Sequence, residues 1–223
     1  MFTKFDMPTM LIVLGATGDL MHKKIVPALF NLYKLGHTPK LFKIIGLSRR
    51  DWSDDDFKQS LRKILANHHK KQLVHKEQIE AFINLWTYHQ GRFDVLSEYK
   101  ELSTKLGFFD DKWNVCSNKL FYIAAPPQFY ETILSNLHDS GLTQPCSPEE
   151  GFTRVLIEKP FGYDSHTASR LEILLSKLFK EEQIYRIDHY LAKENIQNIL
   201  NFRFSNALFD SAWSNKYIEK VEI

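Results

Sequence analysis

The residues best suited to chemistry in this chain lie together in the segment RIDHYLAKE, residues 186–194. A helix that begins near Asp188 would place His189 and Lys193 four residues apart on one face, beside Tyr190. Such a face suits an anion. A carboxylate at a helix start caps main-chain amides and can orient a neighbouring imidazole. The same pattern is also typical of an ordinary polar helix start, so the segment alone leaves both interpretations open.

The elements that must position this segment alternate along the chain. Short apolar runs ended by glycine, proline or polar residues are typical of buried parallel strands, and segments with helical spacing separate them. The predicted strands cover residues 10–14, 41–47, 120–125, 154–158 and 183–187. The predicted helices cover residues 21–35, 54–69, 78–86, 99–106, 128–139 and 164–179. This order indicates an α/β fold with a doubly wound parallel sheet, in which ligands bind beyond the carboxyl ends of the strands.

A glycine-containing turn, GATGDL, follows the first predicted strand. Gly15 and Gly18 would let a pyrophosphate approach the main chain at the N-terminus of the next helix. A full dinucleotide fingerprint has three small residues, whereas this turn is followed by the bulky Met21. The turn therefore predicts coenzyme binding, with a plain tight turn as the alternative.

Two arginines, Arg49 and Arg50, follow the second predicted strand. An NAD-specific enzyme carries an acid there for the ribose hydroxyls, whereas basic residues favour a 2′-phosphate and hence NADP. The hydroxyl of Thr17 can bind the same phosphate. The alternative is a solvated loop.

Lysines lie at two further positions that the sheet would bring to the same edge. Lys23 and Lys24 belong to the first helix, and Lys159 stands between a strand and Pro160. An X-Pro bond at such a place is a candidate for the cis form. We expect Lys159 to bridge a substrate oxygen and a cofactor, and a solvent-facing lysine is the alternative.

Composition excludes several classes of protein. The 223 residues are 43% hydrophobic and 25% charged, as in a globular protein with a sizeable core. Basic and acidic residues number 29 and 27 without a long single-sign block, which argues against a nucleic-acid binder. The apolar run at residues 10–14 is too short to span a membrane, and no secretion signal is evident. We expect a cytoplasmic protein without a metal site, in which Cys116 and Cys146 are both reduced.

Four segments together resemble glucose-6-phosphate dehydrogenase: GATGDLMHKKIVPALFNLYKLG, FYIAAPPQFY, VLIEKPFGYD and YRIDHYLAKENIQN. The resemblance covers essentially the whole chain. It implies a Rossmann-type domain of an NADP-dependent oxidoreductase that converts glucose 6-phosphate to 6-phosphogluconolactone in the pentose phosphate pathway. It also implies that the full-length form is a homodimer or homotetramer.

The resemblance implies three groups of site residues. Coenzyme binding falls to Gly15, Thr17, Gly18, Asp19, Leu20, Arg49 and Lys159. Substrate binding falls to Lys24, His189, Tyr190 and Lys193. Catalytic roles fall to Lys159 and to Asp188, which would orient the catalytic histidine.

The chain departs from the family pattern at several points. The family usually has alanine in place of Met21 and glycine in place of Ala192. Its catalytic histidine lies in a later NHLLQ-like motif, which contains none of the nine histidines here. We therefore expect an NADP-binding Rossmann domain at residues 1–187 and the incomplete start of an α+β domain at residues 188–223, entering a strand at 218–223. Such a chain is expected to have little activity alone.

Two alternatives to this function remain open at the level of sequence. One is a non-catalytic NADP-binding fragment or a degenerate copy. The other is membership of a different class of NADP-linked Rossmann oxidoreductases, which act on a sugar or polyol. Enzymes of that class share the Glu-Lys-Pro motif with this chain but would lack its RIDHYL segment.

Overall fold

The computed structural model describes residues 7–68, 75–146, 150–188, 190, 193–206 and 212–220. The chain divides into two compact units, Met1–Arg186 and Ile187–Ile223.

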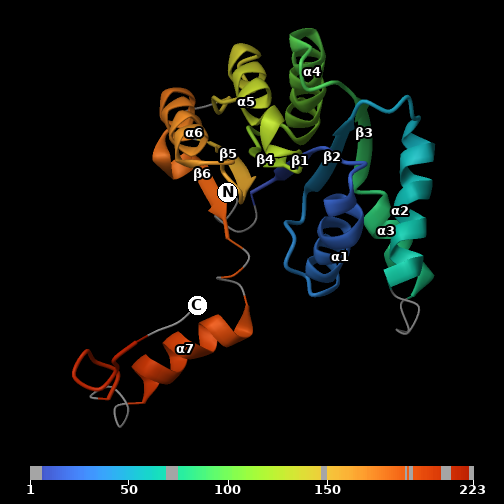
Figure 1. The fold of residues 1–223 in the computed structure, drawn as a ribbon. Coiled ribbons are helices and arrows are strands. Elements are labelled where there is room, and N and C mark those ends of the chain that lie inside the picture. The colour runs from blue at the N-terminus through green and yellow to red at the C-terminus, as the bar shows by residue number, and fades with distance from the viewer. Residues whose placement is uncertain are drawn as a thin grey trace. The chain divides into compact units, whose positions relative to one another are not determined.

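A six-stranded sheet with the order β3-β2-β1-β4-β5-β6 forms the centre of the first unit (Figure 1). The strands are β1 (Thr9–Leu14), β2 (Phe42–Ser48), β3 (Trp86–Gln90), β4 (Asn118–Ile123), β5 (Thr153–Glu158) and β6 (Ile184–Ile187). The pairs β1–β2, β2–β3, β1–β4 and β4–β5 are parallel. This order, with the first strand in the middle, is that of the Rossmann fold, which confirms the predicted fold class.

Helices cover both faces of the sheet (Figure 1). Alternate residues of β1 point to opposite faces, and all six are buried. Met10, Ile12 and Leu14 pack with α4 (Leu96–Trp113), α5 (Tyr130–Asp139) and α6 (Ser165–Leu178). Leu11 and Val13 pack with α1 (Val26–Lys34), α2 (Asp54–His68) and α3 (Lys76–Ile83). The continuous apolar run of β1 is thus explained by burial on both faces.

Local side-chain chemistry fixes where several helices begin and end. Asp164 accepts the N–H of Thr167, whose hydroxyl accepts the N–H of Asp164 in return, and this capping box starts α6. At the C-terminus of α4, Asn114 takes the left-handed conformation, with φ of 51°. Asparagine is among the few residues that tolerate this conformation.

The edge strand β3 corrects the prediction of a helix over residues 78–86. Helix α3 ends at Ile83, and Trp86 is already the first residue of β3. The apolar residues Ile79, Phe82, Ile83 and Trp86 have helical spacing, but they pack into one core cluster from two successive elements. The spacing therefore extended the predicted helix one turn too far.

The second unit contains α7 (Glu194–Ser205). The expectation of a helix that begins near Asp188 was wrong. Lys193 precedes α7 with extended backbone angles, φ −74° and ψ 132°. The carboxylate of Asp188 accepts the N–H of Tyr190 at 3.0 Å, an Asx-type turn that competes with a helix start. Residues 218–220 are irregular, and the rest of the strand predicted there lies outside the described residues.

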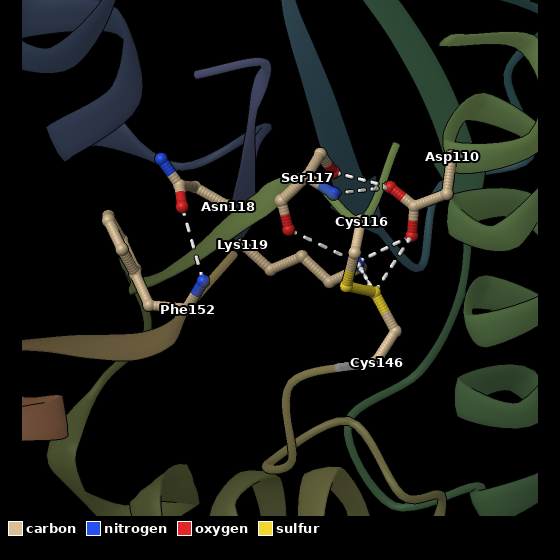
Figure 2. Close-up of a disulfide and its surroundings, with 7 residues drawn as sticks. All are labelled: Asp110, Cys116, Ser117, Asn118, Lys119, Cys146 and Phe152. Carbon is tan, nitrogen blue, oxygen red and sulfur yellow. Dashed lines mark hydrogen bonds and ion pairs between the residues drawn. A yellow bond between two sulfur atoms is a disulfide. The ribbon is translucent and has the colours of Figure 1, made fainter. Parts of the chain in front are cut away.

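A disulfide joins Cys116, in the connection before β4, to Cys146, which follows α5 (Figure 2). The expectation of two reduced cysteines was wrong. Their Cα atoms are 5.9 Å apart, a usual distance for a disulfide. Beside the sulfur atoms, Nζ of Lys119 lies 2.6 Å from Oδ2 of Asp110 and 3.8 Å from Sγ of Cys146. A separation of 30 residues carries no signature of pairing, which is why sequence did not indicate it.

Candidate functional site

The turn between β1 and the first helical segment depends on Gly15. Its φ is +105°, a backbone conformation that residues other than glycine rarely adopt. The N–H groups of Gly15 and Ala16 both donate to the carbonyl of Leu47, at 3.0 Å each. A Cβ atom at Gly15 would lie 2.4 Å from the carbonyl oxygen of Ala124. Glycine therefore allows the turn to lie against the carboxyl ends of both neighbouring strands.

The predicted phosphate site follows in the same turn. The N–H of Gly18 donates to the carbonyl of Gly15 at 3.0 Å, and helical residues begin at Asp19. The first N–H groups of a helix have no intrahelical acceptor, and together with the helix dipole they bind anions. Met21 is fully buried in the core, so its bulk does not occupy the surface of the turn. These residues fit the pyrophosphate of a dinucleotide.

Charged groups surround this turn. Lys23 and Asp19 form an exposed ion pair at 2.7 Å, and this lysine lowers the pKa of the Asp19 carboxyl. Burial lowers the pKa of His22; Asp19 opposes this effect, and Arg50 adds to it. Lys24 is exposed in a single π-helical turn, Met21–Ile25.

The end of β2 meets the coenzyme turn. The hydroxyl oxygens of Thr17 and Ser48 are 2.6 Å apart. Arg49 and Arg50 follow and are exposed, and the guanidinium of Arg50 lies over the ring of Trp52 at 4.9 Å. A hydroxyl pair and two arginines thus occupy the place where a Rossmann protein contacts the ribose of its coenzyme.

The end of β5 presents Lys159. The hydroxyl of Tyr122 donates to the carboxylate of Glu158, and the hydroxyl of Tyr130 donates to the main-chain carbonyl of Glu158 at 3.2 Å. Burial, with the nearby Glu158 carboxylate, raises the pKa of Tyr130 to about 12. The Lys159–Pro160 bond is cis, as predicted. Exposed Lys159 therefore follows a residue that is held by both its side chain and its backbone.

The predicted substrate segment belongs to the second unit. The ammonium of Lys193 lies over the ring of Tyr190 at 4.0 Å. The carboxylate of Asp188 holds the N–H of Tyr190 at 3.0 Å. The structure thus groups the described residues of this segment around Tyr190. His189 lies outside the described residues.

Sequence reasoning missed two groups at the end of β2. No functional role was predicted for either Ser48 or Tyr88, and no strand was predicted over residues 86–90. The hydroxyl of Tyr88 lies within hydrogen-bond distance of the main-chain carbonyls of both Ser48 and Arg50. The aromatic residues Trp86 and Tyr88, with the β-branched Thr87 between them, were the available signal for this strand.

Among the described residues, no helix has the length and apolar character needed to cross a membrane. Within the same residues, no group of three or more histidine, cysteine or acidic side chains could hold a metal ion.

The chain is similar to known sequences of one family. The family model of the glucose-6-phosphate dehydrogenase NAD-binding domain matches residues 12–198. The glucose-6-phosphate 1-dehydrogenase of Chlamydia muridarum is 38% identical over 97% of this chain. Those of Bacillus subtilis and Leuconostoc mesenteroides are each 37% identical, over 96% and 98% of this chain. The chain spans only 42–43% of the length of these relatives.

Solved structures give the same result. A glucose-6-phosphate dehydrogenase in complex with its substrate glucose-6-phosphate matches 97% of this chain and 43% of its own, with a TM-score of 0.83 and 36% identity. A glucose-6-phosphate 1-dehydrogenase from Mycobacterium avium matches 94% of this chain and 42% of its own, with a TM-score of 0.75 and 26% identity.

Proposed function

Because the chain belongs to the glucose-6-phosphate dehydrogenase family, we propose that it forms the NADP-binding part of an enzyme that oxidises glucose 6-phosphate to 6-phosphogluconolactone. This reaction would be the first step of the pentose phosphate pathway. The observation that carries the coenzyme assignment is the meeting of the Gly15–Gly18 turn with Ser48, Arg49 and Arg50 at one edge of the sheet. The turn suits a pyrophosphate, and the arginines suit a 2′-phosphate.

The roles of the coenzyme-binding residues follow from their chemistry. N–H groups of the turn from Gly15 to Leu20 would bind the pyrophosphate, with Asp19 at its exposed side. The guanidinium of Arg49, with the hydroxyl of Thr17, would bind the 2′-phosphate. NADP, when bound, accepts a hydride at C4 of its nicotinamide. Lys159 would hold the substrate close to that ring.

The substrate would be held by its phosphate. Tyr190 and Lys193, which lie together, and His189 are proposed to bind this group, and Lys24 is proposed as a further substrate-binding residue. Binding energy from the phosphate would position C1 of the sugar for reaction. Asp188 would orient the histidine that removes the proton from the C1 hydroxyl, a role that typically contributes about 10²–10⁴-fold in rate.

Two properties of the whole protein belong to the same proposal. We expect a cytoplasmic location, which cell fractionation tests. We expect a homodimer or homotetramer of the full-length form, which light scattering after gel filtration tests.

Calorimetric titration with NADP and then NAD tests the coenzyme assignment. We expect the wild-type chain to bind NADP more tightly than NAD. Arg49→Ala should weaken NADP binding by about 10- to 100-fold, because it removes a charge-assisted contact to the 2′-phosphate.

The matched control is Arg62→Ala, which removes an arginine paired with Glu80 away from this edge and should leave both affinities unchanged. Equal affinity for the two coenzymes, or an Arg49→Ala variant that binds NADP like the wild type, would contradict the NADP assignment. Binding of neither coenzyme would contradict coenzyme binding by this chain.

A further inference from the structure

Tyr88 of β3 is a buried residue beside the arginines that follow β2. Its relative exposure is 6%, and its ring centroid lies 5.1 Å from that of Phe57 and 6.4 Å from that of Trp52. Its N–H donates to the Asp54 carboxylate at 2.7 Å. The ring is therefore fixed by packing and the backbone by a hydrogen bond.

The hydroxyl of Tyr88 lies 2.9 Å from the main-chain carbonyl oxygen of Ser48 and 2.6 Å from that of Arg50. These two carbonyls are on either side of Arg49. A phenol has one proton to donate, so the two oxygens share it. A phenol is protonated at neutral pH, and burial raises the pKa of Tyr88 further. The hydroxyl thus ties together the backbone before and after Arg49.

Other contacts hold the same short stretch. The carbonyl of Ser48 also accepts the N–H of Gly91 at 2.9 Å, and the hydroxyl of Ser48 is 2.6 Å from that of Thr17. The side chain of Arg50 lies over Trp52. Arg49 is then an exposed cation whose flanking residues are all anchored, at the edge where the coenzyme turn begins.

We propose that Tyr88 is a positioning residue for coenzyme selection: its hydroxyl fixes the backbone on both sides of Arg49 and so directs this arginine at the 2′-phosphate that distinguishes NADP from NAD. The inference rests on the proposed coenzyme function. A pre-organised arginine loses less conformational freedom when it binds, and the gain applies only to a ligand that carries the phosphate.

Tyr88→Phe removes the hydroxyl and keeps the ring. We expect the dissociation constant for NADP to rise about tenfold and that for NAD to change by less than about twofold. Adenosine 2′,5′-bisphosphate should lose affinity like NADP, because it carries the same phosphate without the nicotinamide. In an Arg49→Ala background, Tyr88→Phe should have no further effect on NADP binding. Circular dichroism at the titration temperature verifies that each variant is folded.

Tyr99→Phe is the matched control, because Tyr99 is also buried and its hydroxyl also donates to a main-chain carbonyl, that of Phe93 at 3.1 Å. It should leave the ratio of the NADP and NAD affinities unchanged. Equal loss for NADP and NAD in Tyr88→Phe, or no loss, or an undiminished loss in the Arg49→Ala background, overturns the inference while the proposed function stands. Failure of the wild type to bind either coenzyme overturns both.

Discussion

The ammonium group of Lys119 is a buried charge with several polar partners. The side chain is 8% exposed, its ammonium lies 2.6 Å from Oδ2 of Asp110, and the carbonyl of Ser117 is 3.4 Å away (Figure 2). Asp110 in turn accepts both the N–H and the hydroxyl of Ser117. A buried charge of this kind is tolerated because each partner is hydrogen-bonded.

Lys119→Met should therefore destabilise the chain by about 2–4 kcal/mol, because it leaves the Asp110 charge without its ammonium partner. The matched variant Lys23→Met breaks an ion pair whose side chains are 70% and 87% exposed, and it should change stability far less, because solvent screens the pair. Urea unfolding of both variants measures the difference. Similar losses in the two variants would show that burial does not determine the contribution of the pair.

At the scale of single residues, a role could be predicted from the sequence when it depends on neighbouring residues in the chain. The turn at Gly15 was predicted from the glycines that follow an apolar strand, and the structure has a turn there, in which Gly15 has a positive φ. Ser48 and Tyr88 were missed, because their contacts join strands that are 40 residues apart in the chain. The role of Asp188 as a helix start was predicted wrongly, because its side chain bonds the amide two residues later.

At the scale of elements, the contact between β2 and α2 depends on Gly46. A Cβ atom there would lie 2.5 Å from the ring of Phe57 and 2.9 Å from Cβ of Ala16. Both neighbours are buried, so neither can move away freely. This approach brings α2 against the strand that ends at Ser48.

Gly46→Ala should destabilise the chain by about 1–3 kcal/mol, because it overpacks this contact. Gly107→Ala is the matched variant: it adds the same methyl group within α4, where only the chain neighbours and the helix's own backbone lie within 4 Å, and it should stabilise the chain by about 0.5–1 kcal/mol. Thermal melts compare the two. A neutral Gly46→Ala variant would show that α2 can shift to accept the methyl group.

The disulfide links two connections on the side of the sheet where β4 begins. Cys146→Ser should lower the free energy of unfolding by about 2–4 kcal/mol, because the closed loop of 30 residues restricts the unfolded chain. A reducing agent should cause the same loss in the wild type and none in the variant. Identical melts of the wild type with and without reductant would mean that the bond does not form in solution.

At the scale of the whole molecule, most strands and helices could be predicted from the sequence. A strand that is buried on both faces has a continuous run of apolar residues, and an amphipathic helix has apolar residues every three or four positions. The edge strand β3 and the disulfide could not be predicted, since both depend on which segments meet in space. The order of strands required the rule that the first strand of a dinucleotide-binding sheet lies at its centre.

The first unit has its own core on each face of the sheet. A chain cut after Ile187, which keeps the whole of β6, should therefore unfold cooperatively and bind NADP within about twofold of the uncut chain. Calorimetry of the two chains side by side measures this. A large loss of NADP affinity would show that residues 188–223 contribute to the coenzyme site.

The central place of β1 also governs how the chain is made. This strand precedes the other five strands of the sheet in the chain and is buried on both faces, yet one of its two neighbours, β4, begins only at Asn118. At roughly 5–20 residues per second, a ribosome needs about 5–20 s to reach that strand after β1. During that interval one edge of this apolar strand has no partner within the sheet, so we expect the nascent chain to be prone to aggregation at that edge.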